Sequence, residues 1–413
     1  MEIVHIFSVI LTLSAILAYI NKRFINIPTT ISLMIAGLLL SVLIQAFGAY
    51  SPAFKESVEE SLNTLNFPEF LLEFLLSFLL FAGAMHTDLD QMKVFKWPIL
   101  SFATIGVLIS TTLIGVLFYY ILVLLGAPID FIYCLLFGAL ISPTDPIAVL
   151  GILKKAKVPK SLEIKITGES LFNDGIGVVV FLVIYKIALS GLESMSVTDI
   201  SHLLVTEIVG GIGLGFIIGY MGFRMMKTID HYQTEVLISL AIVMGGYSLA
   251  HYLHFSGPLA MVIAGLFIGN QGVAHAMSDI TRDYIHKFWE MIDEILNAVL
   301  FVLIGLELIL VPFDMKYVLI GLIATVLVLV VRYISLAFPT YVMRFRKTFA
   351  PNALVIMTWG GLRGGISIAL ALSLEPEMHK DLIVSITYTV VLFSLVIQGL
   401  TIEKLIKWLK KVA

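Results

Sequence analysis

The chain has 413 residues, of which 59% are hydrophobic and 13% are charged, and its mean hydropathy is +1.01. A soluble domain carries about 25% charged residues, so this composition excludes a soluble protein built around one large core. The net charge of −3 argues against nucleic acid as a partner, and the single Cys134, inside an apolar run, excludes a disulfide framework and a cysteine-based metal site.

Apolar segments long enough to cross about 30 Å of hydrocarbon recur along the chain. In chain order, thirteen membrane spans are predicted at 2–20, 28–48, 66–86, 97–124, 131–153, 164–190, 203–226, 234–253, 257–270, 288–311, 316–343, 351–374 and 381–408. The first span lacks a basic segment and a cleavage site, which indicates a retained helix rather than a signal peptide. Without linkers between the spans, we expect one membrane domain over residues 1–413.

Basic residues alternate between successive loops, with 19 in one set of loops and 3 in the other. The larger set comprises Lys22, Arg23, Lys93, Lys96, Lys154, Lys155, Lys157, Lys160, Arg224, Lys227, Arg282, Lys287, Arg344, Arg346, Lys347, Lys404, Lys407, Lys410 and Lys411, and the smaller set Lys55, Lys316 and Lys380. Because Lys and Arg accumulate in cytoplasmic loops, this tally predicts a cell-membrane protein with its N-terminus outside and its C-terminus in the cytoplasm.

Two predicted helices contain breaks near their middles. If span 203–226 is a linker, the other twelve spans form two six-helix units of inverted topology, and each unit has its break in its fifth helix. The breaks are "SPTDP", Ser142 to Pro146, and "WGGLRGG", Trp359 to Gly365. Proline removes backbone donors and glycine loosens a helix. The sequence therefore predicts an all-α polytopic membrane protein with inverted repeats and crossed discontinuous helices five and twelve, as in many secondary transporters.

Both breaks carry a charged residue. A broken helix exposes a partly positive N-terminus and a partly negative C-terminus at mid-membrane. Asp145 opens the second half of the first broken helix, where a carboxylate stabilises free N–H groups. Arg363 lies at the break of the second, where a cation suits free carbonyls. We expect both to compensate half-helix charge, and a direct role as ion ligand is the alternative.

The sixth span opens with "GESLFNDG", Gly168 to Gly175, which places two carboxylates in an apolar helix. Ser170 and Asp174 share a helix face, with Asn173 beside them. Glu169 points elsewhere, and Arg332 in the eleventh span is available for a structural ion pair with it.

Asp174 is then the carboxylate left without a cation. Because desolvation favours a protonated carboxyl, a proton and a monovalent cation can compete for it. The Ser170 hydroxyl, carbonyls near Thr144 and water would complete an all-oxygen cation site. The sequence therefore predicts an exchanger with no cofactor whose substrates are Na⁺, Li⁺ or K⁺ and H⁺.

Taken together, "SPTDP", "GESLFNDG" and "WGGLRGG" resemble the monovalent cation/proton antiporters of the NhaP and eukaryotic sodium/proton exchanger group, from about the second span to the end of the chain. The resemblance implies an NhaA-like fold and a homodimer. It also implies a moving ion-translocating core at 97–190 and 316–408, beside a dimer-interface scaffold at 1–86 and 234–311.

The resemblance further implies that Asp174 carries the ion, with contributions from Ser170 and Thr144. Asn173 before Asp174 resembles the electroneutral branch of the family, in which a cation exchanges for one proton. The chain departs from the family pattern in the third span, where many relatives carry an acidic residue and this chain has Ala82.

Other polar residues leave alternatives open. Glu290, Asp293 and Glu294 open the tenth predicted span, either as first-turn acids that suit the helix dipole or as a cytoplasmic cation funnel. An intramembrane aspartic protease could pair Asp145 with Asp174, but the Gly-x-Gly-Asp pattern of such enzymes is missing, so we expect no enzyme. A sodium-coupled symporter of inverted-repeat type is the second functional alternative.

Overall fold

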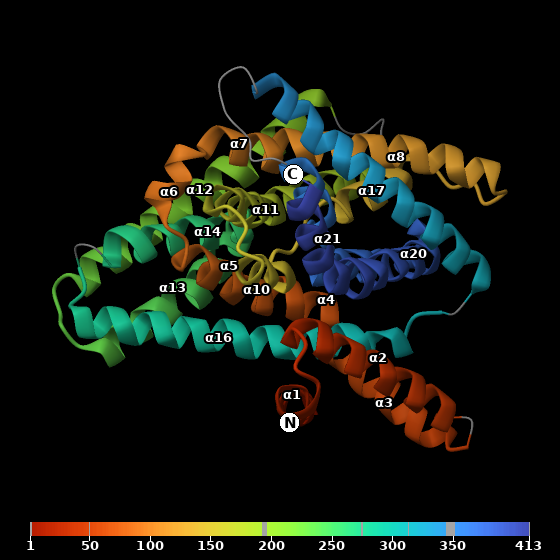
Figure 1. Cartoon of the computed structure of the whole chain (residues 1–413), viewed down its shortest axis with the longest axis horizontal. Helices are drawn as coiled ribbons and strands as arrows, with labels where there is room; N and C mark the ends of the chain where they lie inside the picture. Colours follow the sequence, from red (N-terminus) through yellow and green to blue (C-terminus); the bar gives the residue numbers. More distant parts are fainter. Residues whose placement is uncertain are drawn as a thin grey trace.

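The computed structural model describes residues 2–48, 50–191, 196–273, 276–312, 314–343 and 352–412. Nearly all of these residues lie in helices, and Figure 1 shows α11 near the centre of the molecule with the other helices around it. In the described ranges the only β-type contact is an isolated backbone bridge between Asp145 and Leu362. The all-α fold class expected from the sequence is therefore confirmed.

The helices follow one another with short connections. Their bounds are α1 Glu2–Ile20, α2 Thr29–Gly48, α3 Pro52–Leu65, α4 Phe67–Glu69, α5 Leu76–Met85, α6 Leu89–Val94, α7 Lys96–Ser101, α8 Val107–Leu124, α9 Phe131–Leu140, α10 Ile147–Lys155, α11 Lys160–Ser190, α12 Val197–Met226, α13 Tyr232–Tyr252, α14 Gly257–Phe267, α16 Asp279–Leu306, α17 Met315–Met343, α18 Ala353–Trp359, α19 Gly365–Leu372, α20 Lys380–Leu392 and α21 Gly399–Val412. Wider π-helical turns continue several of these helices, namely η1 Asn21–Ile25, η2 Phe70–Leu75, η3 Phe102–Gly106, η4 Ile268–Gly272 and η7 Phe393–Gln398. Tighter 3₁₀ turns are η5 Glu307–Ile309 and η6 Pro376–Met378.

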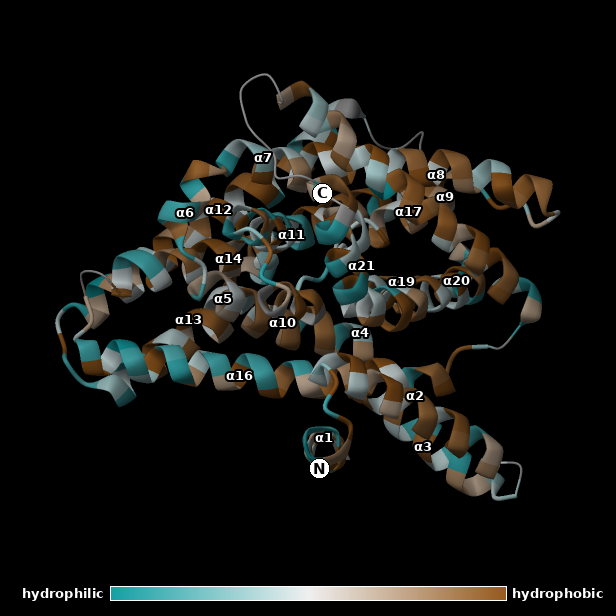
Figure 2. Cartoon of the chain, viewed as in Figure 1, coloured by the Kyte–Doolittle hydropathy of each residue, from teal (hydrophilic) through white to brown (hydrophobic). Residues whose placement is uncertain are grey.

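Each predicted span coincides with a helix, a run of joined helices or two half-helices. Within the described residues, nine helices are long and apolar enough to cross a membrane. Figure 2 shows apolar residues dominating α8 and α17, whereas hydrophilic residues gather on the first half of α16. The total of thirteen crossings and the inverted repeat remain predictions.

Both predicted helix breaks are present. The fifth predicted span divides into α9, which ends at Leu140, and α10, which begins at Ile147. The twelfth divides into α18, which ends at Trp359, and α19, which begins at Gly365. Proline and glycine therefore interrupt the two helices where the sequence indicated.

Two features of the helix map differ from the sequence expectation. The tenth predicted span, 288–311, belongs to a helix that already begins at Asp279, with the Ser278 side chain accepting from the Thr281 backbone N–H. The interpretation of Glu290, Asp293 and Glu294 as first-turn acids is therefore wrong, because Asp279 occupies the first turn. Helix α3 was not predicted, since its polar composition falls below a hydropathy criterion.

Helices α2 and α16 pack with their backbones in contact. A Cβ atom on Gly37 would lie 2.8 Å from the Val302 carbonyl oxygen, and one on Gly305 would lie 2.7 Å from the Gly37 backbone. The Ser41 hydroxyl of α2 donates to the Gly305 carbonyl at 2.6 Å. Glycine at both positions therefore permits a close helix pair along one side of the molecule (Figure 1).

Candidate functional site

The two broken helices meet at their breaks. The Asp145 backbone N–H donates to the Leu362 carbonyl at 2.8 Å, although 216 residues separate them in sequence. The Arg363 guanidinium donates from Nη1 to the Ser142 carbonyl at 2.5 Å and to the Pro143 carbonyl at 2.9 Å. Arg363 therefore supplies a buried positive charge to carbonyls just beyond the C-terminal end of α9, which belongs to the other broken helix.

Asp145 lies against the N-terminal end of α19. A Cβ atom on Gly364 would come within 2.7 Å of Asp145 Oδ2, so glycine leaves the space that the carboxylate occupies. The sequence placed Asp145 at the start of its own half-helix, and the structure also brings it to the start of the partner half-helix. Its negative charge suits the exposed N–H groups there.

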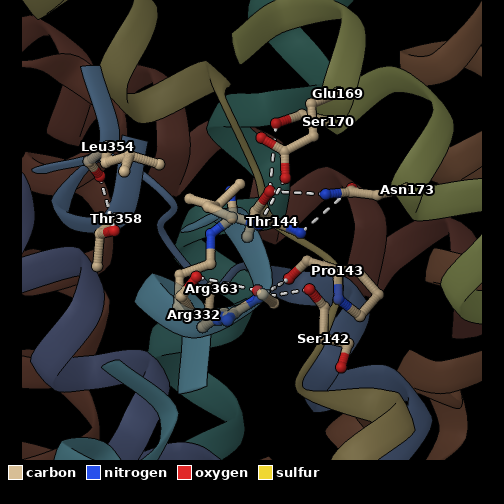
Figure 3. A network of polar contacts seen from close by, with 12 residues as sticks. Ser142, Pro143, Thr144, Glu169, Ser170, Asn173, Arg332, Leu354, Thr358 and Arg363 are labelled. Carbon is tan, nitrogen blue, oxygen red and sulfur yellow. Dashed lines mark hydrogen bonds and ion pairs between the residues drawn. The ribbon is translucent and has the colours of Figure 1, made fainter. Parts of the chain in front are cut away.

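Thr144, Ser170 and Asn173 form a buried hydrogen-bonded cluster (Figure 3). The Asn173 side-chain amide donates to Thr144 Oγ1 at 2.8 Å, and its carbonyl oxygen accepts from the Thr144 backbone N–H at 3.3 Å. The Thr144 and Ser170 hydroxyl oxygens are 3.3 Å apart. These contacts fix the extended segment between α9 and α10 against α11, so Asn173 holds the unwound backbone in place.

Glu169 and Arg332 are in contact. Arg332 Nη1 of α17 lies 2.5 Å from Glu169 Oε1 of α11, and both side chains are almost fully buried. Glu169 Oε2 and Arg332 Nε have no hydrogen-bond partner among the described residues. A buried pair with incomplete hydrogen bonding gains little stability but is costly to split.

A cavity of about 600 Å³ extends from the first turn of α11 to Asp174 and Asp145 at the crossing. Asp174 lines it with 8% of its surface exposed, and no ion pair or hydrogen bond of its side chain occurs among the described residues. Glu163 at the cavity entrance and Asp174 are 11 residues apart on α11, a rise of roughly 16 Å. The cavity therefore reaches a carboxylate deep within the helical body.

The cavity wall holds further acids whose position the sequence left open. Glu290 and Asp293 of α16 line it, together with Glu163, which favours the funnel alternative for the two α16 residues. Asp88 lies in the loop before α6 at the same entrance, and a hydrogen bond from the Gln91 backbone N–H lowers the pKa of its carboxyl. The helical spacing of Glu290 and Asp293 was the signal available in the sequence.

The site suits a monovalent cation as transported substrate. Carboxylate, hydroxyl and carbonyl oxygens are ligands for hard cations. No group of three or more His, Cys, Asp or Glu side chains that could hold a metal ion occurs in the part of the chain that the structure describes. Asp174 and Asp145 face the cavity, whereas Thr144, Ser170 and Asn173 lie behind them.

Comparison with known proteins finds relatives that are described as sodium/proton exchangers or antiporters. The family model described as sodium/hydrogen exchanger, transmembrane, matches residues 10–408. The Na⁺/H⁺ antiporter NhaP of Pseudomonas aeruginosa is 50% identical over 402 residues, which cover 96% of this chain and 95% of that protein. The Na⁺/H⁺ antiporter NhaH of Halobacillus dabanensis is 32% identical over 384 residues, which cover 92% of this chain and 91% of that protein.

A solved structure shares the fold. The sodium proton antiporter MjNhaP1 of Methanocaldococcus jannaschii, determined at pH 8, superposes with a TM-score of 0.77 and covers 99% of both chains at 21% sequence identity. This likeness concerns the fold alone.

Proposed function

The chain belongs to the sodium/hydrogen exchanger family, and from this premise we propose that it exchanges Na⁺ for H⁺ across a membrane as a secondary antiporter. The observation that carries the proposal is Asp174, a carboxylate at the end of a deep cavity, beside crossed helix breaks. The names of the relatives favour antiport over the symport alternative.

Asp174 is proposed to bind either Na⁺ or a proton, but not both. An ionised carboxylate within a membrane protein is costly unless it is neutralised or hydrated. Either substrate neutralises Asp174, so the loaded site can be closed off from water and the empty, charged site cannot. This coupling prevents the protein from returning without a counter-substrate.

The residues around Asp174 have supporting roles in this proposal. The Ser170 hydroxyl and the backbone near Thr144 would add neutral oxygen ligands when Na⁺ is bound. Asn173 holds Thr144 in position, and the Glu169–Arg332 pair fixes α11 against α17. Asp145 and Arg363 compensate the half-helix ends, which lets the unwound segments persist at mid-membrane.

The cavity entrance is proposed to face the cytoplasm. Support comes from the predicted distribution of basic residues. Lys93 in the short helix α6 and Lys160 at the start of α11 lie on the entrance side, and Lys160 itself lines the cavity. Arg344, Arg346 and Lys347, which contribute to the same tally, lie outside the described residues. This assignment places the C-terminus in the cytoplasm and the N-terminus outside the cell.

Exchange is proposed to be electroneutral, one cation for one proton. Asn173 is neutral and Glu169 is paired with Arg332. Asp174 is therefore the carboxylate that binds a cation in one half of the cycle and a proton in the other. Asp145 stays ionised in this proposal because the helix N-terminus next to it favours its charge. Each cycle then moves one positive charge in each direction.

We also propose that the protein is a homodimer in the cell membrane, with residues 97–190 and 316–408 moving against a scaffold of 1–86 and 234–311. Exposed apolar side chains on α1, including Val4, Val9 and Ile16, leave a face that lipid or a second copy can cover. Li⁺ and K⁺ are possible alternative substrates, and a cation titration in vesicles decides between them.

The test is Asp174→Asn in membrane vesicles loaded with a pH-sensitive dye. Addition of Na⁺ should move protons in vesicles with the wild-type protein and give no response with the variant. Asp130→Asn, at the far end of α9 from the crossing, is the matched control and should exchange normally. Retained exchange in Asp174→Asn above a few per cent would refute the assignment of the site.

A further inference from the structure

Glu307 is a buried carboxyl residue that the proposed mechanism does not use. It is 2% exposed and begins the 3₁₀ turn η5, directly after α16 ends at Leu306. Its Oε1 atom has no hydrogen-bond partner, and no cation among the described residues lies within ion-pair distance of it. An intramembrane carboxyl without a partner is costly to keep, so it calls for a functional explanation.

A structural role does not explain Glu307. It lies at the C-terminal end of a long helix, where the helix dipole disfavours a negative charge. The carbonyls of this helix end already accept hydrogen bonds from α2, from Ser41 to Gly305 and from Gln45 to Leu308. A carboxyl group adds nothing to these contacts, and an apolar side chain would fill the same volume at lower cost.

Glu307 lies on the face of α16 that lines the cavity. Asp293, Asn297, Leu300, Ile304 and Glu307 follow one another at intervals of three or four residues, so they share one helix face. Asp293 and Leu300 line the cavity. The face that is open to water at Asp293 therefore continues to Glu307, about 21 Å further along the helix.

Beyond Leu300 this face is closed by the proposed moving core. A Cβ atom on Gly365 of α19 would lie 2.9 Å from Leu300 and 3.2 Å from Ile304, so α19 packs directly on α16 there. The Tyr388 hydroxyl of α20 donates to the Ile304 carbonyl at 3.3 Å, about one helical turn before Glu307. The Ser385 hydroxyl donates to the Pro312 carbonyl at 3.2 Å.

We propose that Glu307 is the cation-binding carboxylate of the opposite half of the ion path, covered by Tyr388 in this state and exposed when the core moves away from α16. The inference deepens the proposed function and rests on it. Asp293 on one side of Asp174 and Glu307 on the other would attract cations from the two faces of the membrane in turn. Separation of α20 from α16 breaks the Tyr388 and Ser385 contacts and admits water to Glu307.

The test measures Na⁺ dependence from each side of the membrane separately. Everted and right-side-out vesicles expose opposite faces, and the apparent KM for Na⁺ is measured at both. For Glu307→Gln we expect the KM on the face away from the cavity to rise about fivefold to tenfold, the effect of removing one nearby charge. The KM on the cavity face should stay unchanged.

Glu377→Gln is the matched control, because Glu377 is exposed in the turn that precedes α20 and lies outside the packed face. It should leave both KM values unchanged. Equal changes of KM at both faces with Glu307→Gln would indicate a merely structural residue and overturn the proposal, as would no change at either face.

A second measurement is independent of transport by the variant. The chain has one cysteine, the buried Cys134, so Glu307→Cys in a Cys134→Ala background gives a single reporter. A membrane-impermeant thiol reagent should modify it from the face away from the cavity, and faster with Tyr388→Phe added. Failure to label from that face overturns the proposal. Absence of exchange by the wild-type protein would instead refute the proposed function.

Discussion

Replacing either partner of the buried Glu169–Arg332 pair should destabilise the protein strongly. The two side chains are 1% and 6% exposed and lie 2.5 Å apart. Removing one partner leaves an uncompensated buried charge, which costs about 3–5 kcal/mol. Removing both leaves no such charge, so the double variant should lose clearly less than the sum of the single losses.

The assay is thermal unfolding in detergent of Glu169→Gln, Arg332→Ala and the double variant. The exposed pair Glu403 and Lys407 provides a matched control, since surface ion pairs contribute little to stability. A double-mutant cycle on this pair should show no coupling free energy. Gly361→Ala offers an independent perturbation, because its Cβ would lie 2.8 Å from Arg332 Nε and displace the guanidinium. Additive losses at Glu169 and Arg332, or unchanged melting temperatures, would refute the reasoning.

Two further predictions concern the crossing of the broken helices and the transport cycle. Gly364→Ala should reduce Na⁺-driven proton movement in vesicles by about tenfold or more, because a Cβ 2.7 Å from Asp145 Oδ2 displaces the carboxylate. The control is Gly151→Ala, whose Cβ meets nothing within 4 Å. Equal rates of proton movement for the two variants would contradict the prediction. With the membrane potential clamped by K⁺ and valinomycin, the initial rate of exchange should be independent of that potential. A rate that follows the potential would mean that a second proton moves in each cycle, and Asp145 would be the residue to examine.

The breaks in the two crossed helices could be predicted because their cause is local. Pro143 and Pro146 lack backbone donors, and the glycines around Arg363 loosen the helix, so the interruption follows from the residues themselves. The contact between Glu169 and Arg332 was also accessible, since a buried charge in an apolar helix demands a partner. These inferences need no knowledge of how the helices pack.

The contacts that Asp145 and Arg363 make at the breaks were harder to predict from the sequence. The sequence indicates that Arg363 suits free carbonyls, but not that these belong to Ser142 and Pro143 on the other broken helix. In the same way, Asp145 lies at the start of α19 only because two segments distant in sequence cross there. Side-chain partners across such a crossing depend on tertiary packing, which periodicity does not report.

The position of the acidic residues in the cavity wall and the start of α16 could not be predicted from the sequence, for a different reason. Hydropathy locates membrane spans, and the first half of α16 is too polar to register as part of one. The amphipathic pattern that places Glu290 and Asp293 on the inner face becomes informative only when the facing helices are known. Glu307, to which no sequence pattern assigned a role, is likewise placed by the packing around α16.

The crossing of the two broken helices is held largely by main-chain oxygens. Leu362, Ser142 and Pro143 each contribute a carbonyl as acceptor, and Asp145 contributes a backbone N–H. Every amino acid supplies such a carbonyl, so substitutions at the acceptor positions leave these hydrogen bonds available. The frame of the site is thus separable from the side chains that meet the ion. Ion preference can consequently be re-engineered, or can drift during evolution, by exchanging side chains within a scaffold that keeps its shape.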